Sequence, residues 1–235
     1  MVTVYSRWYA GRLGEKLRRP FVRFLQLAAR ESGQILNYAA ISHETGISQP
    51  TVKNYYQLLE DMFVGFRVPA YSRSPRKNLL STPKFFLFDL GVRHTAAGLK
   101  PSADLVHANP GPLFEQWVGI ELWKRLQYLG EGTLFYQRTR DGAEVDFIVE
   151  HGGRLTPIEV KWTERPSLSD ARHLLTFLGE HPRNARRGTS SAAAPARCNW
   201  MTGSRRCSGT AYGGRPLLPT REFCYGVPRV SIAAR

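Results

Sequence analysis

Three charged residues in two neighbouring apolar segments are the residues of this sequence best suited to chemistry. Asp146 stands at the start of an apolar run, and Glu159 and Lys161 alternate with apolar residues in the next one. Because side chains alternate between the two faces of a strand, Glu159 and Lys161 are expected on one face. The Gly152-Gly153 pair predicts a turn between the two strands. Asp146 can therefore lie opposite Glu159 and Lys161.

Two carboxylates and an ammonium on one sheet face predict a site for a divalent metal ion. Unpaired charge among apolar neighbours is costly, so a cation or mutual pairing should compensate it. Mg²⁺ or Mn²⁺ would be satisfied by Asp146, Glu159 and the carbonyl oxygen of Val160, with water filling the remaining positions. The metal would polarise a phosphate while Lys161 orients or deprotonates the attacking water, which is the chemistry of a nuclease. The alternative is a solvated strand edge with a simple Glu159–Lys161 pair.

The elements around these residues predict an α/β core with a mixed sheet. A helix is expected to begin near Gly111-Pro112 and to run through F-E-Q-W-V-G-I-E-L-W-K-R-L. Three strands follow, T-L-F-Y-Q-R-T, A-E-V-D-F-I-V-E and L-T-P-I-E-V-K-W, and residues 169–180 return to a helix. The order helix, three strands, helix is typical of such a core.

The segment before this core predicts a helix-turn-helix. Within residues 21–62, Asn37 and Ser48 are suited to begin the second and third helices, and Gly46 supplies the turn between them. Two strands, V-G-F-R-V-P-A-Y and K-F-F-L-F-D-L, then flank a basic loop, as in a winged helix. A winged-helix fold used only for docking a protein is the alternative.

The predicted winged helix would contact DNA through polar side chains of its third helix and basic side chains of its loop. These residues are Gln49, Thr51, Lys53 and Asn54 on the helix, and Arg73, Arg76 and Lys77 in the loop. The helix is not strongly basic, so weak binding to DNA is expected. Because the body of the chain is mildly basic, that binding should depend strongly on salt.

Taken together, these motifs resemble a known family. The matching pieces are S-G-Q-I-L-N, T-G-I-S-Q-P-T-V-K-N-Y, L-L-E-D-M-F-V, K-F-F-L-F-D-L-G, G-P-L-F-E-Q-W-V, R-T-R-D-G-A-E-V-D-F-I-V and P-I-E-V-K. From about Arg18 to Pro182 the chain is similar to the C-terminal region of bacterial and archaeal AAA-type ATP-binding proteins. There a winged helix precedes a domain of uncharacterised function with the restriction-endonuclease-like, PD-(D/E)XK fold.

The resemblance implies roles for individual residues. Asp146, Glu159 and Lys161 match the metal-binding and water-activating positions of that fold, so they are the expected catalytic set. Glu115 matches the helix carboxylate that often completes the metal site. Glu121 competes with it, but six helical residues turn by about 240°, so both cannot face one metal.

Two arginines near the site, Arg138 and Arg140, are candidates for phosphate contacts. The alternative for both is a solvent-facing strand charge.

Members of the family carry an ATPase with a G-x-x-x-x-G-K-[ST] loop, and this sequence contains no such string. We therefore expect a truncated member with no ATP site, and a protein partner in place of the ATPase is a candidate. The prediction is a metal-dependent, nucleic-acid-binding nuclease. The alternative is a non-catalytic remnant that only binds DNA or protein.

The composition changes near the end of the chain. From Asn184 onward there are nine arginines, no lysine and one glutamate, so this part carries +8 of the net charge of +14. Such a composition is what a GC-rich gene yields out of frame, so residues 189–235 are expected to be frameshifted and disordered. The expected domains are thus residues 1–96, 97–188 and this tail. All three cysteines, Cys198, Cys207 and Cys224, lie in the tail without metal-site spacing, so neither zinc nor a disulfide framework is expected.

No run of residues is long and apolar enough to span a membrane, and the start M-V-T-V-Y-S-R-W-Y lacks the features of a secretion signal. A cytoplasmic location without membrane contact is expected.

Overall fold

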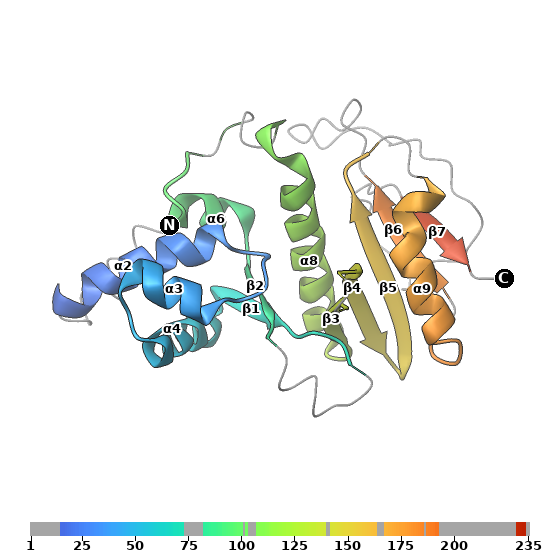
Figure 1. Cartoon of the computed structure of the whole chain (residues 1–235), viewed down its shortest axis with the longest axis horizontal. Coiled ribbons are helices and arrows are strands. Elements are labelled where there is room, and N and C mark those ends of the chain that lie inside the picture. Colours follow the sequence, from blue (N-terminus) through green and yellow to red (C-terminus); the bar gives the residue numbers. More distant parts are fainter. Residues whose placement is uncertain are drawn as a thin grey trace. The chain divides into compact units, whose positions relative to one another are not determined.

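The structure is a computed structural model that describes residues 15–72, 82–100, 102, 107–139, 142–163, 167–185, 187–192 and 229–233 (Figure 1). The chain divides into two compact units, Met1–Glu121 and Leu122–Arg235. The division falls inside helix α8 (Pro110–Leu129), so each unit holds part of that helix. The boundary expected at residues 96/97 stays a prediction.

The first unit contains helices and one small sheet. Its elements are α2 (Glu15–Arg30), α3 (Tyr38–Thr45), α4 (Gln49–Asp61), β1 (Gly65–Val68), β2 (Lys84–Leu87), α6 (Leu90–Ala96) and the first part of α8. Strands β1 and β2 pair antiparallel, with Phe66 opposite Phe86. An isolated antiparallel bridge joins Ile35 to Lys84, so the segment between α2 and α3 also lies beside β2.

Side-chain caps fix the bounds of α3 and α4 where the sequence predicted them. Asn37 Oδ1 accepts a hydrogen bond from the N–H of Ala40 at 3.0 Å, and Ser48 Oγ accepts one from the N–H of Thr51 at 3.4 Å. Gly46 ends α3 in the left-handed conformation, with φ of 72°. The two helices, their caps and the glycine between them are therefore confirmed, and the winged-helix fold stays a prediction.

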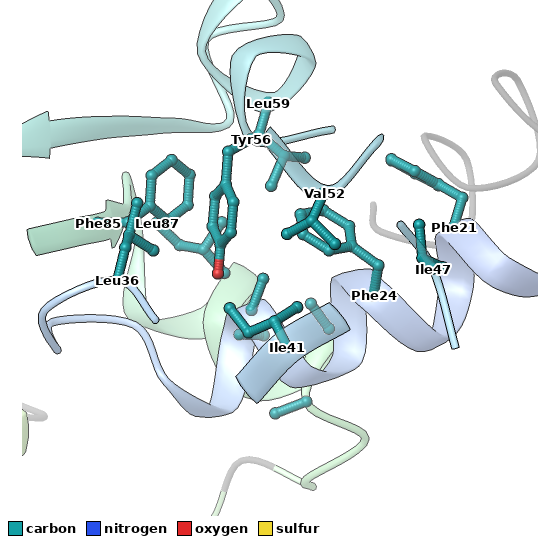
Figure 2. Close-up of a cluster of buried hydrophobic side chains, with 14 residues drawn as sticks. Phe21, Phe24, Leu36, Ile41, Ile47, Val52, Tyr56, Leu59, Phe85 and Leu87 are labelled. Carbon is teal, nitrogen blue, oxygen red and sulfur yellow. The ribbon is translucent and has the colours of Figure 1, made fainter. Parts of the chain in front are cut away.

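The core of this unit is apolar and rich in aromatic rings (Figure 2). Ile41 of α3, Val52 of α4 and Ile47 between the two helices are all buried. Tyr56 lies at the centre of this core. Its ring centroid is 4.9 Å from that of Phe24, and the two ring planes meet at 84°, which is a favourable edge-to-face contact. Burial of such side chains holds the short helices together, because helices of this length are marginal alone.

One helix of the first unit was not predicted. The apolar run K-F-F-L-F-D-L was expected to be a strand throughout, but β2 ends at Leu87 and α6 begins at Leu90. Asp89 causes the change, because its Oδ1 accepts a hydrogen bond from the N–H of Val92 at 2.9 Å and so caps the new helix.

The second unit is an α/β structure with one five-stranded sheet. After the end of α8 come β3 (Thr133–Arg138), β4 (Glu144–His151), β5 (Arg154–Lys161), the 3₁₀ turn η1 (Leu168–Ala171), α9 (Arg172–Glu180), β6 (Arg187–Ala192) and β7 (Arg229–Ala233). The strands lie in chain order, β3-β4-β5-β6-β7. Only β5 and β6 are parallel and the other neighbours are antiparallel, so the predicted mixed sheet is confirmed.

Helix α9 connects the parallel pair and packs against β4, β5 and β6. It buries Leu174, Phe177 and Leu178, which recur at helical spacing, and Phe147 and Ile148 of β4 are also fully buried. This apolar layer fixes the strands that carry the candidate site.

The structure differs from the expectation that nothing packs from Thr189 onward. Strand β6 continues to Ala192 beside β5, with Ser190 opposite Glu159, and β7 pairs with β6. The first residues of the tail are small, and a backbone ladder needs no side-chain burial, so apolar periodicity could not reveal this strand. Residues 193–228, including the three cysteines, lie outside the described residues. The frameshift stays a prediction.

Within the part of the chain that the structure describes, no helix is long and apolar enough to cross a membrane.

Candidate functional site

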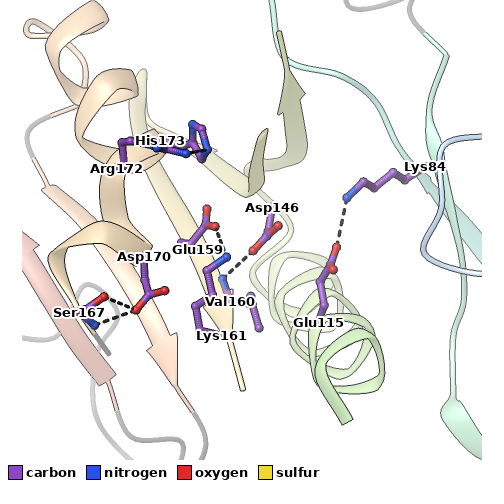
Figure 3. A network of polar contacts seen from close by, with 10 residues as sticks. All are labelled: Lys84, Glu115, Asp146, Glu159, Val160, Lys161, Ser167, Asp170, Arg172 and His173. Atoms are coloured by element: carbon purple, nitrogen blue, oxygen red, sulfur yellow. Dashed lines mark hydrogen bonds and ion pairs between the residues drawn. The ribbon is translucent and has the colours of Figure 1, made fainter. Parts of the chain in front are cut away.

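Asp146 lies where β4 and β5 stop pairing. The ladder between these strands ends with Phe147 opposite Ile158, so the next positions are Asp146 and Glu159. There a side chain and not a backbone carbonyl bonds the neighbouring strand: Oδ2 of Asp146 accepts a hydrogen bond from the N–H of Val160 at 2.7 Å (Figure 3). This bond fixes a carboxylate at the open end of the strand pair.

Glu159 and Lys161 form an ion pair on β5, so the two side chains share one face of the strand as their alternation predicted; the pair itself is what the alternative to a metal site expected. The Nζ of Lys161 lies 2.8 Å from the Oε1 of Glu159. The Glu159 side chain is only 4% exposed, whereas that of Lys161 is 36% exposed. The ammonium of Lys161 is therefore accessible to solvent above the buried carboxylate of Glu159, and an accessible ammonium can contact an anionic substrate.

The charge on Lys161 is stabilised by its surroundings. Partial burial by itself would lower the pKa of Lys161, but the hydrogen bond and charge of Glu159, with the charges of Asp146 and Asp170, raise it above its ordinary value. Lys161 is thus an ammonium at neutral pH. Whether Lys161 orients or deprotonates an attacking water stays a prediction.

The donors at this site suit a hard divalent cation. Asp146 and Glu159 offer carboxylate oxygens, which Mg²⁺ and Mn²⁺ prefer, and Mg²⁺ is usually held by one or two carboxylates and several waters. Across the described ranges, no three His, Cys, Asp or Glu side chains gather closely enough to hold a metal. The residues present thus fit a two-carboxylate, water-rich site and not a cage built from protein alone.

The sequence did not single out Asp170, which lies in a turn that packs against β5. It belongs to η1, and its Oδ2 accepts hydrogen bonds from the N–H and the Oγ of Ser167, at 2.8 and 2.7 Å. The Ser167-x-x-Asp170 spacing before an apolar helix is the signal that could have found it. Arg172 and His173 follow in the first turn of α9, where Nη2 of Arg172 lies 3.4 Å from Nε2 of His173.

Glu115, expected to complete the metal site, has a different partner. It lies in the first unit, and its Oε1 is 3.1 Å from the Nζ of Lys84, whose side chain is 5% exposed. The next residue, Gln116, is buried and bonds both the backbone oxygen and the hydroxyl of Ser32. Glu121, the competing candidate, is half-buried in the same unit. The described structure thus assigns Glu115 to the packing of α8, and its role toward a metal stays a prediction.

The residues expected to contact DNA on the third helix lie in the first two turns of α4. Gln49, Lys53 and Asn54 are exposed, and Thr51 is half-buried because its hydroxyl lies 2.8 Å from that of Ser48. The Nζ of Lys53 lies 5.4 Å from the centre of the Tyr38 ring. Most of this helix face is therefore available to a partner.

The remaining expected contacts are only partly described. Arg138 is exposed at the end of β3 and lies opposite Glu144 of β4. Arg73, Arg76, Lys77 and Arg140 lie outside the described residues.

Comparisons with known proteins give families and relatives of unknown function. Residues 10–103 match the model of a domain of unknown function (DUF8612), and residues 110–195 match that of a second one (DUF4143). Uncharacterised proteins of Mycobacterium tuberculosis and Mycobacterium bovis are each 28% identical to this chain over 166 residues, which is 66% of this chain and 37% of theirs. An uncharacterised protein of Haemophilus influenzae is 28% identical over 156 residues, 64% of this chain and 36% of the relative.

The chain thus spans little more than a third of the length of these curated relatives. No solved structure matches it. The two family models meet between residues 103 and 110, just before α8.

Proposed function

We propose that this chain is a metal-dependent nuclease-like module, in which Asp146 and Glu159 hold Mg²⁺ or Mn²⁺ beside Lys161. The observation that carries the proposal is the cluster at the end of β4 and β5. Asp146 is tied to Val160 of β5, and Val160 stands between Glu159 and Lys161. One hydrogen bond to the backbone and one ion pair thus link Asp146, Glu159 and Lys161.

The order of elements in the second unit supports a restriction-endonuclease-like core. A helix, three antiparallel strands, a crossing helix and a parallel strand follow one another from α8 to β6. In such a core the metal-binding carboxylates lie where the central strands part, as Asp146 and Glu159 do. Fold alone does not imply activity, so any activity depends on the residues of the site.

The chemistry that we propose is hydrolysis of a phosphodiester. A bound divalent cation would supply Lewis acidity toward a phosphate oxygen and activate water. Lys161 would donate hydrogen bonds to the phosphate or the water, and Glu159 would keep that ammonium in place. Asp146 would hold one side of the cation while its bond to Val160 keeps the carboxylate oriented.

A nucleic-acid interface on the first unit is the second part of the proposal. The order α2, Ile35 bridge, α3, α4, β1, loop, β2 is that of a winged helix, with α4 in the position of the recognition helix. Gln49, Lys53 and Asn54 are exposed there, and Lys53 is the one cation among them. We infer weak, strongly salt-dependent binding to the DNA backbone.

The greater length of the relatives supports a protein partner. The chain spans 37% of the mycobacterial relatives, so these relatives contain a further part, and the family resemblance implies an ATPase as the partner of such modules. A module that only docks onto such a partner is the competing function.

The test is cleavage of supercoiled plasmid and linear DNA in Mg²⁺ and in Mn²⁺. Asp146→Asn, Glu159→Gln and Lys161→Met should each reduce cleavage by at least about 100-fold, as expected when charge stabilisation in the transition state is lost. Glu150→Gln is the matched control, because this half-buried carboxylate lies on the same strand as Asp146 but at the other end. Cleavage that persists in all three site variants would show a contaminating nuclease. Absence of cleavage by the wild type would favour the docking module.

A further inference from the structure

One lysine of the first unit is held by an aromatic ring and not by a carboxylate. The Nζ of Lys53, on α4, lies 5.4 Å from the centre of the Tyr38 ring, on α3. Lys84 and Lys161, in contrast, each pair with a glutamate. Among the residues that the structure describes, no carboxylate lies within ion-pair distance of Lys53.

We propose that Tyr38 is a positioning residue that holds the ammonium of Lys53 in place for contact with one phosphate of a DNA duplex. The proposal rests on the proposed nucleic-acid interface of α4, in which Lys53 is exposed. It adds a residue of α3 to an interface for which the sequence indicated only residues of α4 and of the loop after β1.

An aromatic ring suits this purpose better than a carboxylate, because it does not neutralise the ammonium. The ring face attracts a cation through its quadrupole, so the pair keeps a full positive charge. A glutamate partner would cancel that charge and would compete with a phosphate for the same N–H donors. Since Lys53 is exposed, the N–H groups that do not face the ring remain available to a phosphate.

Tyr38 is itself fixed, so its contact with Lys53 defines a place for the ammonium. It is the first residue of α3, which Asn37 caps by accepting a hydrogen bond from the N–H of Ala40 at 3.0 Å. Its half-buried ring lies 6.0 Å from the fully buried ring of Tyr56, with 76° between the ring planes. Helix α3 also packs against α4 (Figure 1). The core of the first unit therefore anchors the ring that Lys53 covers.

Order in the free protein is what gives this contact an effect on binding. A phosphate immobilises the lysine side chain that it contacts, and the loss of rotamer freedom opposes binding. Because the Tyr38 ring already confines the ammonium, less of this cost falls on the binding step. Removal of the ring should therefore weaken DNA binding only through Lys53.

A double-mutant cycle between Tyr38 and Lys53 tests this dependence. Tyr38→Leu removes the ring face but keeps an apolar side chain, and Lys53→Met removes the charge but keeps the stem. A short DNA duplex of mixed sequence is titrated into the full chain, and the Kd is read from the side-chain amide signal of Asn54. Because Asn54 is an exposed residue of α4, this signal reports occupancy of α4 and not of other basic parts of the chain.

The expected effects are ordered. Lys53→Met should raise the Kd about fivefold and lower the salt slope by about one. Tyr38→Leu should raise the Kd about threefold in the wild type and have no further effect in Lys53→Met, whereas Tyr38→Phe should retain binding. Tyr55→Leu is the matched control, since it also removes a half-buried tyrosine, one that packs against Phe21 and Phe24, and it should leave the Kd unchanged.

The contact itself is measured without DNA, from the ring-current shift of the Lys53 ε-protons. The shift should be upfield in the wild type and in Tyr38→Phe and should be lost in Tyr38→Leu. Its absence from the wild type would overturn the positioning role, as would an effect of Tyr38→Leu on the Kd that persists in Lys53→Met. If Lys53→Met leaves the Kd unchanged, the nucleic-acid interface of α4 fails and the role of Tyr38 with it. The ring-current shift would still be present in that case, so the two failures are distinguishable.

Discussion

The molecule contains two lysine–glutamate pairs of similar length whose burial is reversed. In the first unit Lys84 is 5% exposed and its partner Glu115 is 28% exposed, with 3.1 Å between the atoms. In the second unit Glu159 is 4% exposed and its partner Lys161 is 36% exposed, with 2.8 Å between them. The buried member is thus the cation in one pair and the carboxylate in the other.

This difference in burial indicates that the two ion pairs have different roles. A buried lysine needs its carboxylate, so Glu115 compensates a charge that packing has enclosed. A buried carboxylate whose lysine partner is half-exposed lies next to solvent-accessible charge, so a second cation can approach it while the lysine stays paired. The Lys84–Glu115 pair is therefore structural, and the Glu159–Lys161 pair has the arrangement of a binding site.

The largest effect that would test this comparison is the removal of Glu115. Glu115→Ala leaves the ammonium of Lys84 enclosed without this carboxylate, so we expect a loss of about 2 kcal/mol of unfolding free energy. This is somewhat less than for a fully buried pair, because Glu115 is partly exposed. Urea unfolding followed by tryptophan fluorescence measures the loss. The exposed carboxylate of Glu44 provides the control, since Glu44→Ala should change stability by less than about 0.5 kcal/mol.

The same variant also sharpens the assignment of Glu115. If it contributes only to packing, Glu115→Ala keeps whatever stabilisation Mn²⁺ gives the second unit. A Mn²⁺ response that disappears in Glu115→Ala would restore Glu115 as a metal ligand.

The next effect concerns the Glu159 pair. At a Mn²⁺ concentration ten times its dissociation constant, binding should stabilise the folded wild type by about 1.4 kcal/mol. Glu159→Gln and Asp146→Asn should abolish this gain, while the stability of either variant without metal should change much less than that of Glu115→Ala. Thermal unfolding over a Mn²⁺ titration measures both. If Mn²⁺ stabilises the wild type and both variants equally, Glu159 and Asp146 do not bind the metal, and the Glu159–Lys161 pair is not a binding site.

Sequence reasoning could predict features set by neighbours along the chain. The caps Asn37 and Ser48 act over three residues, so they were visible in the sequence. The alternation of Glu159 with Lys161 is equally local. In contrast, the partner of Glu115 is 31 residues away in Lys84, on a strand whose approach depends on the folding of the first unit. Family resemblance assigned Glu115 to a metal because nothing local indicated that contact.

Two other differences have the same origin. Helix α6 begins within an apolar run because one side chain, Asp89, caps it, and an apolar pattern alone does not show where a strand ends. Strand β6 uses the backbone of Thr189, Ser190 and Ser191 beside β5, which side-chain periodicity does not report.

A smaller change in stability is expected from backbone strain at Phe63 in the first unit, and it should not alter metal binding in the second. Phe63 follows α4 with φ of 57°, and it is the one non-glycine residue with positive φ in the described ranges. Its N–H bonds the oxygen of Glu60, and that of Val64 bonds the oxygen of Leu59, as in a Schellman motif, where glycine is favoured. The Phe63 side chain is 80% exposed and gains little from packing.

Phe63→Gly should therefore stabilise the first unit by about 0.5–1 kcal/mol, since glycine relieves the left-handed conformation. Phe63→Ala is the control, because it removes the ring but keeps the strain, and it should not stabilise. The Mn²⁺ response should be the same in both variants as in the wild type. If Phe63→Ala stabilises as much as Phe63→Gly, exposure of the ring and not the backbone is the cause.

The smallest effect concerns Asp170, whose carboxylate accepts two hydrogen bonds from Ser167 at the start of η1. Hydrogen bonds from Ser167, with a contribution from Lys161, lower the pKa of Asp170 below its ordinary value. A carboxyl whose folded pKa is depressed stabilises the fold above its unfolded pKa of about 3.9, and this contribution is lost as the pH falls through the folded pKa. At neutral pH Asp170→Asn should thus be less stable than the wild type by no more than about 0.5 kcal/mol, since the group is well solvated. The two stabilities should converge as the pH falls below 4, which urea unfolding between pH 3 and 7 can follow. A difference that stays constant over this range would mean that the loss comes from the cap of η1 and not from the charge of Asp170.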